Sequence, residues 1–256
     1  MKLATWNVNS LKVSLPQVLK WLAKHGPDAL CLQETKLENA KFPAAEIEAA
    51  GYTALHNGQK TYNGVAIVSL APLRETIMEI PGFEDPQRRV LAATIGGIRI
   101  INVYVPNGES TESDKYQYKL RWLAAFRGWI ATELKQHPRL AVLGDFNIAP
   151  EDRDVHDPAA WEGKVLFSGP ERSALQELLA AGLKDGFRLF EQPDRSFTWW
   201  DYRMNAFRRR MGLRIDHILL SDALAKSCAS CTIDIEPRGN ERPSDHAPVI
   251  AELKDA

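Results

Sequence analysis

Apolar residues along the chain fall into short runs that predict strands, separated by a smaller number of helical patterns. Runs of Val, Ile, Leu and Ala that alternate with polar residues, or end in them, are typical of strands. The expected strands cover residues 2–8, 28–33, 64–70, 90–95, 98–105, 140–143, 197–202, 214–220, 229–235 and 247–253. Gly96 and Gly97 predict a two-residue hairpin turn between two of these strands.

Helical periodicity, with apolar residues three or four positions apart, is clearest over residues 113–137. Another helix is expected to begin at Ser14 and to end before Gly26, because Ser is a common N-cap and Pro16 would lie in the first turn. Shorter helices are expected at residues 43–50 and 173–181, and a loop at residues 152–168.

Many strands and few helices favour two sheets packed face to face with helices outside. A doubly wound parallel sheet would need more crossover helices than the pattern provides. The opening strand-helix-strand unit (3–33) is similar to the helix and strand at 116–145, which hints at an internal duplication. No linker interrupts the 256 residues, so we expect one α/β (α+β) domain over residues 1–256.

Composition adds mainly exclusions. A net charge of -1 with 45% apolar residues is ordinary for a soluble protein and gives no global basic signal for nucleic acid. Three cysteines argue against a disulfide framework and for a reducing compartment. Cys228 and Cys231 lack the second pair that a zinc site needs. Without a leader pattern or a membrane-length apolar run, a cytoplasmic protein with no membrane association is expected.

Several predicted strands end in residues of the types used in catalysis. Taken singly, each is better explained as a turn former, an exposed strand end or a structural residue. Asp216 is the least ordinary of them, because it lies inside an apolar run where a carboxylate is costly unless it is paired. Together these residues predict one polar mouth at the edge of a sandwich. The set comprises Asn7, Glu34, Tyr104, Asp145, Asn147, Asp216, Asp245 and His246.

Six strings resemble motifs of the endonuclease/exonuclease/phosphatase superfamily. They are WNVN (6–9), LQETK (32–36), NVY (102–104), GDFN (144–147), LRID (213–216) and SDHAP (244–248). With PNGES (106–110) and FTWWDYR (197–203), the chain more narrowly resembles the exonuclease III family of abasic-site DNA repair nucleases. The resemblance implies a four-layered αββα sandwich of two mixed sheets. It also implies Mg²⁺- or Mn²⁺-dependent cleavage of the phosphodiester 5′ to an abasic site in duplex DNA.

The resemblance also implies roles for the polar residues. Asp145 would orient or deprotonate the attacking water, Asn147 and Tyr104 would donate to phosphoryl oxygens, and Asp216 with His246 would face the scissile phosphate. Which group is the base, and whether the histidine is protonated, stays open. A hard cation suits this chemistry because it neutralises the phosphate and prefers carboxylate oxygens. The implied metal set is Asn7, Glu34, Asp145, Asn147, Asp245 and His246.

Contact with DNA would need other residues. A local basic surface is predicted, although such runs are also typical of a solvated loop. Its residues are Arg88, Arg89, Arg203, Arg208, Arg209, Arg210 and Arg214. Trp199, Leu213 and Ile215 resemble the family's apolar pocket for a sugar that lacks its base, which costs little to extrude. One of Trp199 and Trp200 is expected to lie in the core.

The first functional hypothesis is a base excision repair nuclease that cuts at abasic sites, with 3′-phosphatase, 3′-phosphodiesterase and 3′→5′ exonuclease activity. Its partner would be duplex DNA with abasic sites or blocked 3′ ends, bound by a monomer. A close alternative is a 3′-end specialist with little abasic-site activity, set by the loops at 163–169 and 205–211. A catalytically silent regulator is disfavoured because the metal and base residues are all present. A lipid or inositol phosphatase is disfavoured by the arginine loop and the aromatic motif.

Overall fold

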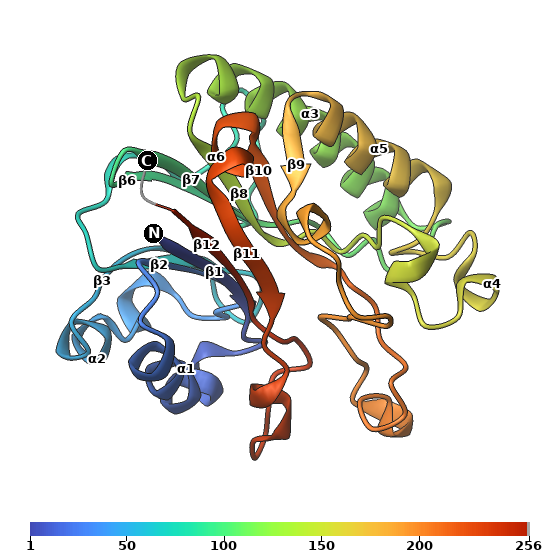
Figure 1. Cartoon of the computed structure of the whole chain (residues 1–256), viewed down its shortest axis with the longest axis horizontal. Coiled ribbons are helices and arrows are strands. Elements are labelled where there is room, and N and C mark those ends of the chain that lie inside the picture. Colours follow the sequence, from blue (N-terminus) through green and yellow to red (C-terminus); the bar gives the residue numbers. More distant parts are fainter. Residues whose placement is uncertain (255–256) are drawn as a thin grey trace.

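The computed structural model describes residues 1–254 and contains two six-stranded sheets stacked face to face (Figure 1). Sheet A comprises β1 (Lys2–Asn7), β2 (Ala29–Gln33), β3 (Thr53–Asn57), β4 (Val65–Ser69), β11 (Cys228–Ile233) and β12 (Val249–Leu253). Sheet B comprises β5 (Arg74–Ile77), β6 (Val90–Ile95), β7 (Ile98–Tyr104), β8 (Leu140–Asp145), β9 (Leu183–Asp185) and β10 (Asp216–Ser221). The strand orders are β11-β12-β1-β2-β4-β3 and β5-β6-β7-β8-β10-β9.

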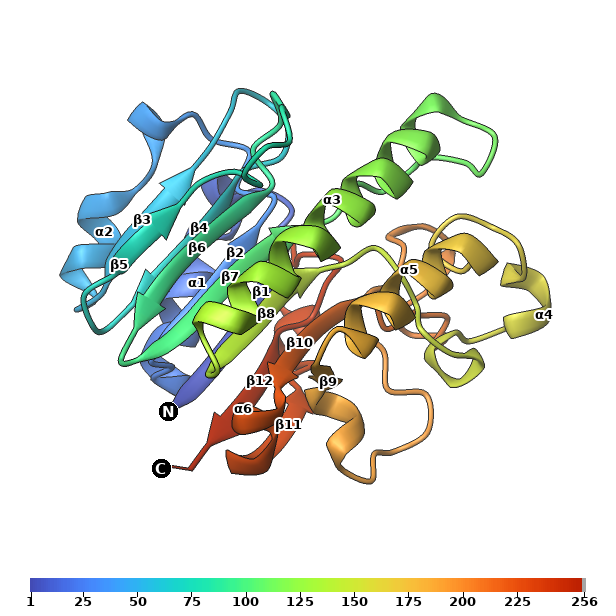
Figure 2. The ribbon, with the colours of Figure 1, turned by 90° about the horizontal axis from the view of Figure 1, so that it is seen from above.

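Helices α1 (Leu11–His25) and α2 (Ala44–Ala49) cover the outer face of sheet A, and helices α3 (Asp114–Gln136) and α5 (Gly169–Ala180) cover that of sheet B. The short helix α4 (Pro158–Trp161) lies in a connecting loop, and α6 (Asp222–Ser227) joins β10 to β11. Figure 1 shows α1 and α2 against sheet A and, on the opposite side, α3 and α5 against sheet B. Seen from above, α3 runs along β7 and β8 (Figure 2). The predicted αββα sandwich of two mixed sheets is therefore confirmed. Within residues 1–254, no helix is both long and apolar enough to cross a bilayer.

Three apolar layers hold the sandwich together, and the strand period of two assigns residues to them. In β1, Leu3 packs into the central layer between the sheets, whereas Ala4 packs into the layer under α1 and α2. In β8, Leu143 joins the central layer and Val142 joins the layer under α3 and α5. Sheet strands buried on both faces explain why these runs are apolar throughout.

Both sheets share one pattern of pairing. At the centre of sheet A, β1 and β2 are parallel and are joined through α1; at the centre of sheet B, β7 and β8 are parallel and are joined through α3. All other neighbouring pairs are antiparallel. This correspondence supports the internal duplication suggested by the sequence. It also brings the carboxyl ends of two parallel pairs to one edge of the molecule.

Gly144 determines how closely β8 approaches β7 immediately before the acidic strand end. Its φ is +153°, and a Cβ atom there would lie 1.9 Å from the carbonyl oxygen of Val103 on β7. Any side chain at this position would push the strands apart. Glycine is therefore required for the close approach that fixes the following Asp145.

Two helices begin earlier than predicted. Helix α1 begins at Leu11, so Ser14 and Pro16 lie inside it. The Ser14 hydroxyl donates to the carbonyl oxygen of Val8 (2.9 Å), so it ties the helix to β1 and does not cap it. Helix α5 begins at Gly169 behind a capping box of Ser168 and Glu171.

Other departures from prediction lie in edge and connecting segments. Residues 197–202 do not form a strand; Trp199 makes only isolated bridges, to Leu213 and to His246. The predicted loop at 152–168 contains a 3₁₀ turn (Asp152–Asp154) and α4. Strands β3, β5 and β9 were not predicted, because edge strands pair on one side only and carry a weaker apolar pattern. Helix α6 was also missed.

Candidate active site

The central strands of the two sheets deliver polar side chains to one edge. Asn7 ends β1 and Glu34 follows β2, while Tyr104 and Asp145 end the parallel strands β7 and β8. Strand register then sets a row in sheet B. Asp145 pairs with Tyr104 on one side and with Asp216, the first residue of β10, on the other.

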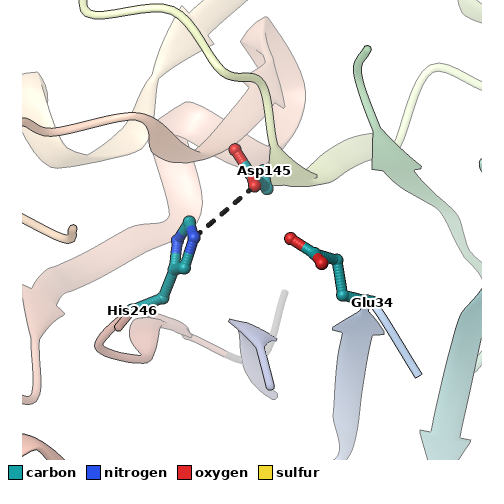
Figure 3. A group of neighbouring side chains, drawn as sticks. All are labelled: Glu34, Asp145 and His246. Carbon is teal, nitrogen blue, oxygen red and sulfur yellow. Dashed lines mark ion pairs between the residues drawn. The ribbon is translucent and has the colours of Figure 1, made fainter. Parts of the chain in front are cut away.

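Glu34, Asp145 and His246 converge from three different elements (Figure 3). Each offers one atom able to bind a metal, and these atoms all lie within 4.8 Å of one another. The Asn7 amide joins the two carboxylates, since Nδ2 donates to Glu34 Oε1 (2.9 Å) and to Asp145 Oδ2 (2.9 Å). The carboxylates of Asp145, which is buried, and Glu34, which is partly buried, repel each other at this distance, and a hard divalent cation would relieve that repulsion. The donor set therefore fits Mg²⁺ or Mn²⁺.

His246 and Asp216 form the predicted carboxylate-histidine pair. The distance between Nδ1 and Asp216 Oδ2 is 2.8 Å, and Nε2 lies 3.8 Å from Asp145 Oδ2. Burial alone would lower the pKa of His246, but the carboxylates of Asp216 and Asp145 outweigh it and raise the pKa to about 10. The ring is then a cation at neutral pH, with Nδ1–H donating to Asp216 Oδ2 and Nε2–H facing Asp145. In that state it offers no lone pair to a metal, so its ligand role stays a prediction.

Asp145 and Glu34 respond differently to the same surroundings. Burial raises the pKa of Asp145 to about 7, with the charge of Asp216 acting in the same direction against that of His246. Burial also acts to raise the pKa of Glu34, but the Lys36 ammonium group overcomes it and holds that pKa below its usual range. Asp145 can therefore exchange a proton near neutral pH, whereas Glu34 remains ionised.

Asn147 is held by its neighbours on both sides. Its backbone N–H donates to Asp145 Oδ1 (2.9 Å), and its side-chain Nδ2 donates to the carbonyl oxygen of Val105 (3.0 Å). The Asn107 amide donates to Asn147 Oδ1 (3.0 Å). Glu34 and Asn147 both have a positive φ, 52° and 50°, a conformation that non-glycine residues keep where the surroundings enforce it.

Tyr104 reaches the same edge, and Arg89 braces it. Burial and the nearby Glu34 and Asp145 raise the pKa of Tyr104 well above its usual value, so its hydroxyl stays protonated and can donate. The Arg89 guanidinium lies 4.7 Å from the Tyr104 ring centroid and donates to the Tyr104 carbonyl oxygen (3.0 Å). Arg89 is only 8% exposed, so it supports the site from behind, unlike the DNA-facing surface predicted for it. Its neighbour Arg88 is half-buried.

Asp245 precedes His246 in the chain, but its carboxylate is not part of the cluster formed by Glu34, Asp145 and His246. One of its carboxylate oxygens accepts a hydrogen bond from the Trp199 indole N–H (3.0 Å). Its predicted role as a metal ligand therefore stays a prediction, and the contact it makes in the protein orients Trp199.

The predicted basic surface is divided. Arg203, Arg208, Arg209 and Arg210 lie exposed on one loop, as expected. The assignment of Arg214 to that surface is wrong, because its side chain is 1% exposed and pairs with Asp154 and Asp185. A guanidinium inside an apolar run needs such partners, and the neighbouring strand β9 that supplies one of them was not predicted.

The apolar residues predicted to form a sugar pocket belong to a packed cluster. Leu213 and Ile215 are 0% and 1% exposed and pack with Phe167 and Leu166, which is 5% exposed. Trp199 packs against the edge of this cluster and remains partly exposed. Trp200 lies in the core, as expected for one of the two tryptophans.

Two residues that support the site, Asn107 and Lys119, were not predicted from the sequence. Asn107 follows β7 as Asn147 follows β8, a parallel that could have singled it out. Lys119 lies three residues after Tyr116 and four before Leu123, on the apolar stripe of α3, where a lysine is unusual. Both contact the segment that carries Asn147.

Known nucleases are similar to this chain over nearly its whole length. The model of the Endonuclease/Exonuclease/phosphatase family matches residues 4–246. Exodeoxyribonuclease III of Haemophilus influenzae is 35% identical over 267 residues, covering 99% of this chain and 100% of that protein. A 3′-5′ exonuclease, NExo, from Neisseria meningitidis is 50% identical with a TM-score of 0.98. A second NExo structure from Neisseria, described as a 3′ phosphatase bound to a product DNA hairpin, is 49% identical and also has a TM-score of 0.98. Both comparisons cover 100% of each chain.

An AP endonuclease from Archaeoglobus fulgidus is 39% identical, with a TM-score of 0.96 and 100% coverage of both chains. Similarity thus extends over the whole chain to exonucleases and to abasic-site endonucleases alike. The chain belongs to the exonuclease III and AP endonuclease family of the endonuclease/exonuclease/phosphatase superfamily, and it is a DNA phosphodiesterase of that type.

Proposed function

We propose that this DNA repair nuclease acts chiefly on DNA 3′ ends, removing 3′ phosphates and other blocking groups, and that it cuts at abasic sites more slowly. The order of the two activities expected from the sequence is thereby reversed. The observation that carries the proposal is the closed packing over Leu213 and Ile215. The likeness to NExo, described as a 3′ phosphatase and 3′-5′ exonuclease, supports it independently.

An extrahelical abasic sugar needs an open apolar recess beside the catalytic group. Here Leu166 and Phe167 pack on the residues that would line it. Leu166 has a φ of +76°, a left-handed conformation that costs a residue with a side chain roughly 1–2 kcal/mol. Its backbone N–H donates to Glu171 Oε1 (3.1 Å), which fixes this segment. Leu166 and Phe167 thus form a fixed wall over Leu213 and Ile215. This wall leaves no room there for a sugar, so it favours a substrate that presents only a terminal phosphate.

Glu34 would hold Mg²⁺ or Mn²⁺, and the Asn7 amide links its carboxylate to that of Asp145. When bound, the cation neutralises the phosphate and acts as a Lewis acid on it. A water activated by a buried carboxylate needs that carboxylate to accept a proton near neutral pH. The raised pKa of Asp145 suits this role, and general-base catalysis contributes roughly 10²–10⁴-fold.

The remaining side chains stabilise charge on the phosphoryl group. Asp216 orients the His246 ring, and the protonated ring directs Nε2–H toward the mouth beside Asp145. The Tyr104 hydroxyl adds a second donor from the other side of Asp145. Each donor aimed at developing charge is worth about 3 kcal/mol in comparable sites.

DNA would be held by the exposed arginine loop and by Arg88. The exposed residues of this loop are Arg203, Arg208, Arg209 and Arg210. Neutralising phosphates releases counterions, so binding should weaken steeply as salt rises even though the net charge of the chain is -1. The proposed partner is duplex DNA with a blocked 3′ end, bound by one copy of the chain.

The test compares three duplexes on one preparation: a 3′ phosphate, an internal abasic-site analogue and an intact 3′ end. We expect 3′-phosphate removal to be fastest, with no reaction of any duplex in EDTA. Abasic incision as fast as phosphate removal would reject the proposal. That outcome would support abasic-site incision as the main activity, a second candidate favoured by the partly exposed Trp199 and the likeness to the Archaeoglobus AP endonuclease.

A pair of variants isolates the wall. Leu166→Gly relieves the left-handed strain and removes the side chain over the cluster, so abasic incision should rise relative to 3′-phosphate removal by about tenfold, the effect of about 1.4 kcal/mol. Leu166→Met keeps the bulk and should keep the ratio. An unchanged ratio in the glycine variant would show that the wall does not set the preference.

A further inference from the structure

Lys119 is fully buried in α3, and its ammonium group contacts the loops that leave β7 and β8. Nζ donates to the carbonyl oxygen of Asn147 (2.7 Å) and to that of Asn107 (3.1 Å). The third contact is an ion pair with Glu171 in the first turn of α5, and both side chains are 0% exposed. One charged group therefore joins two catalytic loops and two helices.

Glu171 extends the connection to the wall over the apolar cluster. Its Oε1 accepts from the backbone N–H of Leu166 (3.1 Å), and its Oε2 accepts from the backbone N–H of Ser168 (3.1 Å). The same carboxylate thus caps α5 and holds the preceding turn. All of the groups that donate to Glu171 are buried, so water cannot take the place of these hydrogen bonds.

Stability is a poor explanation for this ion pair. Desolvating two charges costs several kcal/mol, and well-packed apolar replacements of buried pairs are often neutral or stabilising. What the pair does provide is a fixed geometry. Lys119 holds the carbonyl groups of the same two residues, Asn107 and Asn147, whose side chains hydrogen-bond to each other.

We infer that Lys119, paired with Glu171, is a positioning residue for the nuclease reaction. It holds Asn147 against the loop after β7, and the backbone N–H of Asn147 in turn holds Asp145 Oδ1 (2.9 Å). Lys119 is too deeply buried to touch the substrate. The inference rests on the proposed roles of Asp145 and Asn147, and it applies to whichever DNA substrate the enzyme turns over fastest.

The main test is Lys119→Met, assayed for kcat and KM at saturating Mg²⁺ alongside thermal unfolding. Misplacing a catalytic group by about 1 Å can cost roughly 10²-fold, so we expect kcat to fall by that order while KM changes less than about threefold. A matched control is Arg99→Met. Arg99 donates to Glu133 (2.6 Å) near the other end of α3, and this pair is also buried. The control should lose stability and keep kcat.

A double variant protects the test against misfolding. Lys119→Met with Glu171→Met leaves no buried charge unpaired, so it should fold and still show the loss in kcat. If Lys119 acts through Asn147, adding Lys119→Met to Asn147→Ala should cost little more than Asn147→Ala alone. A folded Lys119 variant with wild-type kcat, or fully additive losses, would overturn the inference. A wrong substrate assignment would instead change which duplex the wild type prefers, and would leave the ratio between wild type and variant unchanged.

Discussion

Sheets A and B have the same connectivity at their centres but contribute different chemical groups to the candidate active site. Each has a parallel pair at its centre, joined by a helix and flanked by antiparallel strands. Sheet A supplies Asn7, Glu34 and, before β12, His246, whereas sheet B supplies the row Tyr104, Asp145 and Asp216. A repeated framework therefore does not imply a repeated site. Glu34 in sheet A fits the binding of a cation, whereas Asp145 in sheet B fits proton transfer.

Asp145→Asn in sheet B should have the largest effect. The amide cannot accept the proton of water, so turnover should fall by roughly 10²–10⁴-fold, the scale of general-base catalysis. Single-turnover cleavage of 3′-phosphorylated duplex measures this loss, and DNA affinity measured by fluorescence anisotropy should be retained. Turnover within an order of magnitude of wild type would remove Asp145 from its assigned role.

Tyr104→Phe removes one donor from the same row and keeps the ring under Arg89. Losing a donor to the phosphoryl group costs about 10²-fold in kcat by analogy with oxyanion holes. The measurement is kcat at saturating DNA and Mg²⁺. An unchanged kcat would mean that the hydroxyl does not face the developing charge.

Glu34→Gln tests the contribution of sheet A. The variant retains the hydrogen bond to Asn7 and loses the negative charge that attracts the cation, so the Mg²⁺ concentration for half-maximal activity should rise by roughly 10–100-fold. Activity should recover as Mg²⁺ is raised, which Asp145→Asn should not do. If both variants respond alike to Mg²⁺, the division of labour between the sheets is wrong.

The smallest expected effect comes from two buried histidines, His217 and His246. They change the pH dependence of the free energy of unfolding in opposite directions. Burial, reinforced by Arg214, lowers the pKa of His217, because Arg214 donates to Nδ1 (3.0 Å) and keeps the ring neutral. The unfolded chain takes up this proton as the pH falls through about 6.5, whereas the folded chain takes it up only at a lower pH, so His217 lowers the stability of the protein on acidification. His246, with its raised pKa, gains stability over the same interval.

Urea unfolding of His217→Gln and His246→Gln in EDTA separates these two contributions. Relative to wild type, the first variant should lose less stability on acidification and the second should lose more. Equal pH profiles for wild type and both variants would mean that neither histidine is held in its assigned protonation state.

The sequence was sufficient to predict the two stacked sheets, because their layers depend on local pattern, and it identified polar strand ends that the fold brings to one edge. Apolar runs such as Leu140–Leu143 are buried on both faces, and Gly144 marks where the strand ends. Asp216 stood out because a carboxylate inside a strand needs a partner, and His246 provides it (2.8 Å).

What the sequence could not predict depends on contacts between distant segments. Arg89 and Arg214 read as surface cations until Tyr104, Asp154 and Asp185 are brought beside them. The wall at Leu166 depends on a left-handed backbone conformation of that residue, which no pattern in the sequence predicts. Edge strands and loop turns were missed because they bury little and leave weak apolar periodicity.

Hydrogen bonds that cross between the sheets have one further consequence. Asn7 reaches from sheet A to Asp145 in sheet B, and Gln33 reaches in the same direction to Asn102 (2.8 Å). The thickness of the apolar filling between the sheets is therefore a dimension of the catalytic machinery itself. A larger or smaller side chain in this layer would lower the rate of the reaction even where the protein remains folded. The interior of this nuclease is therefore subject to a constraint that folding alone would not impose.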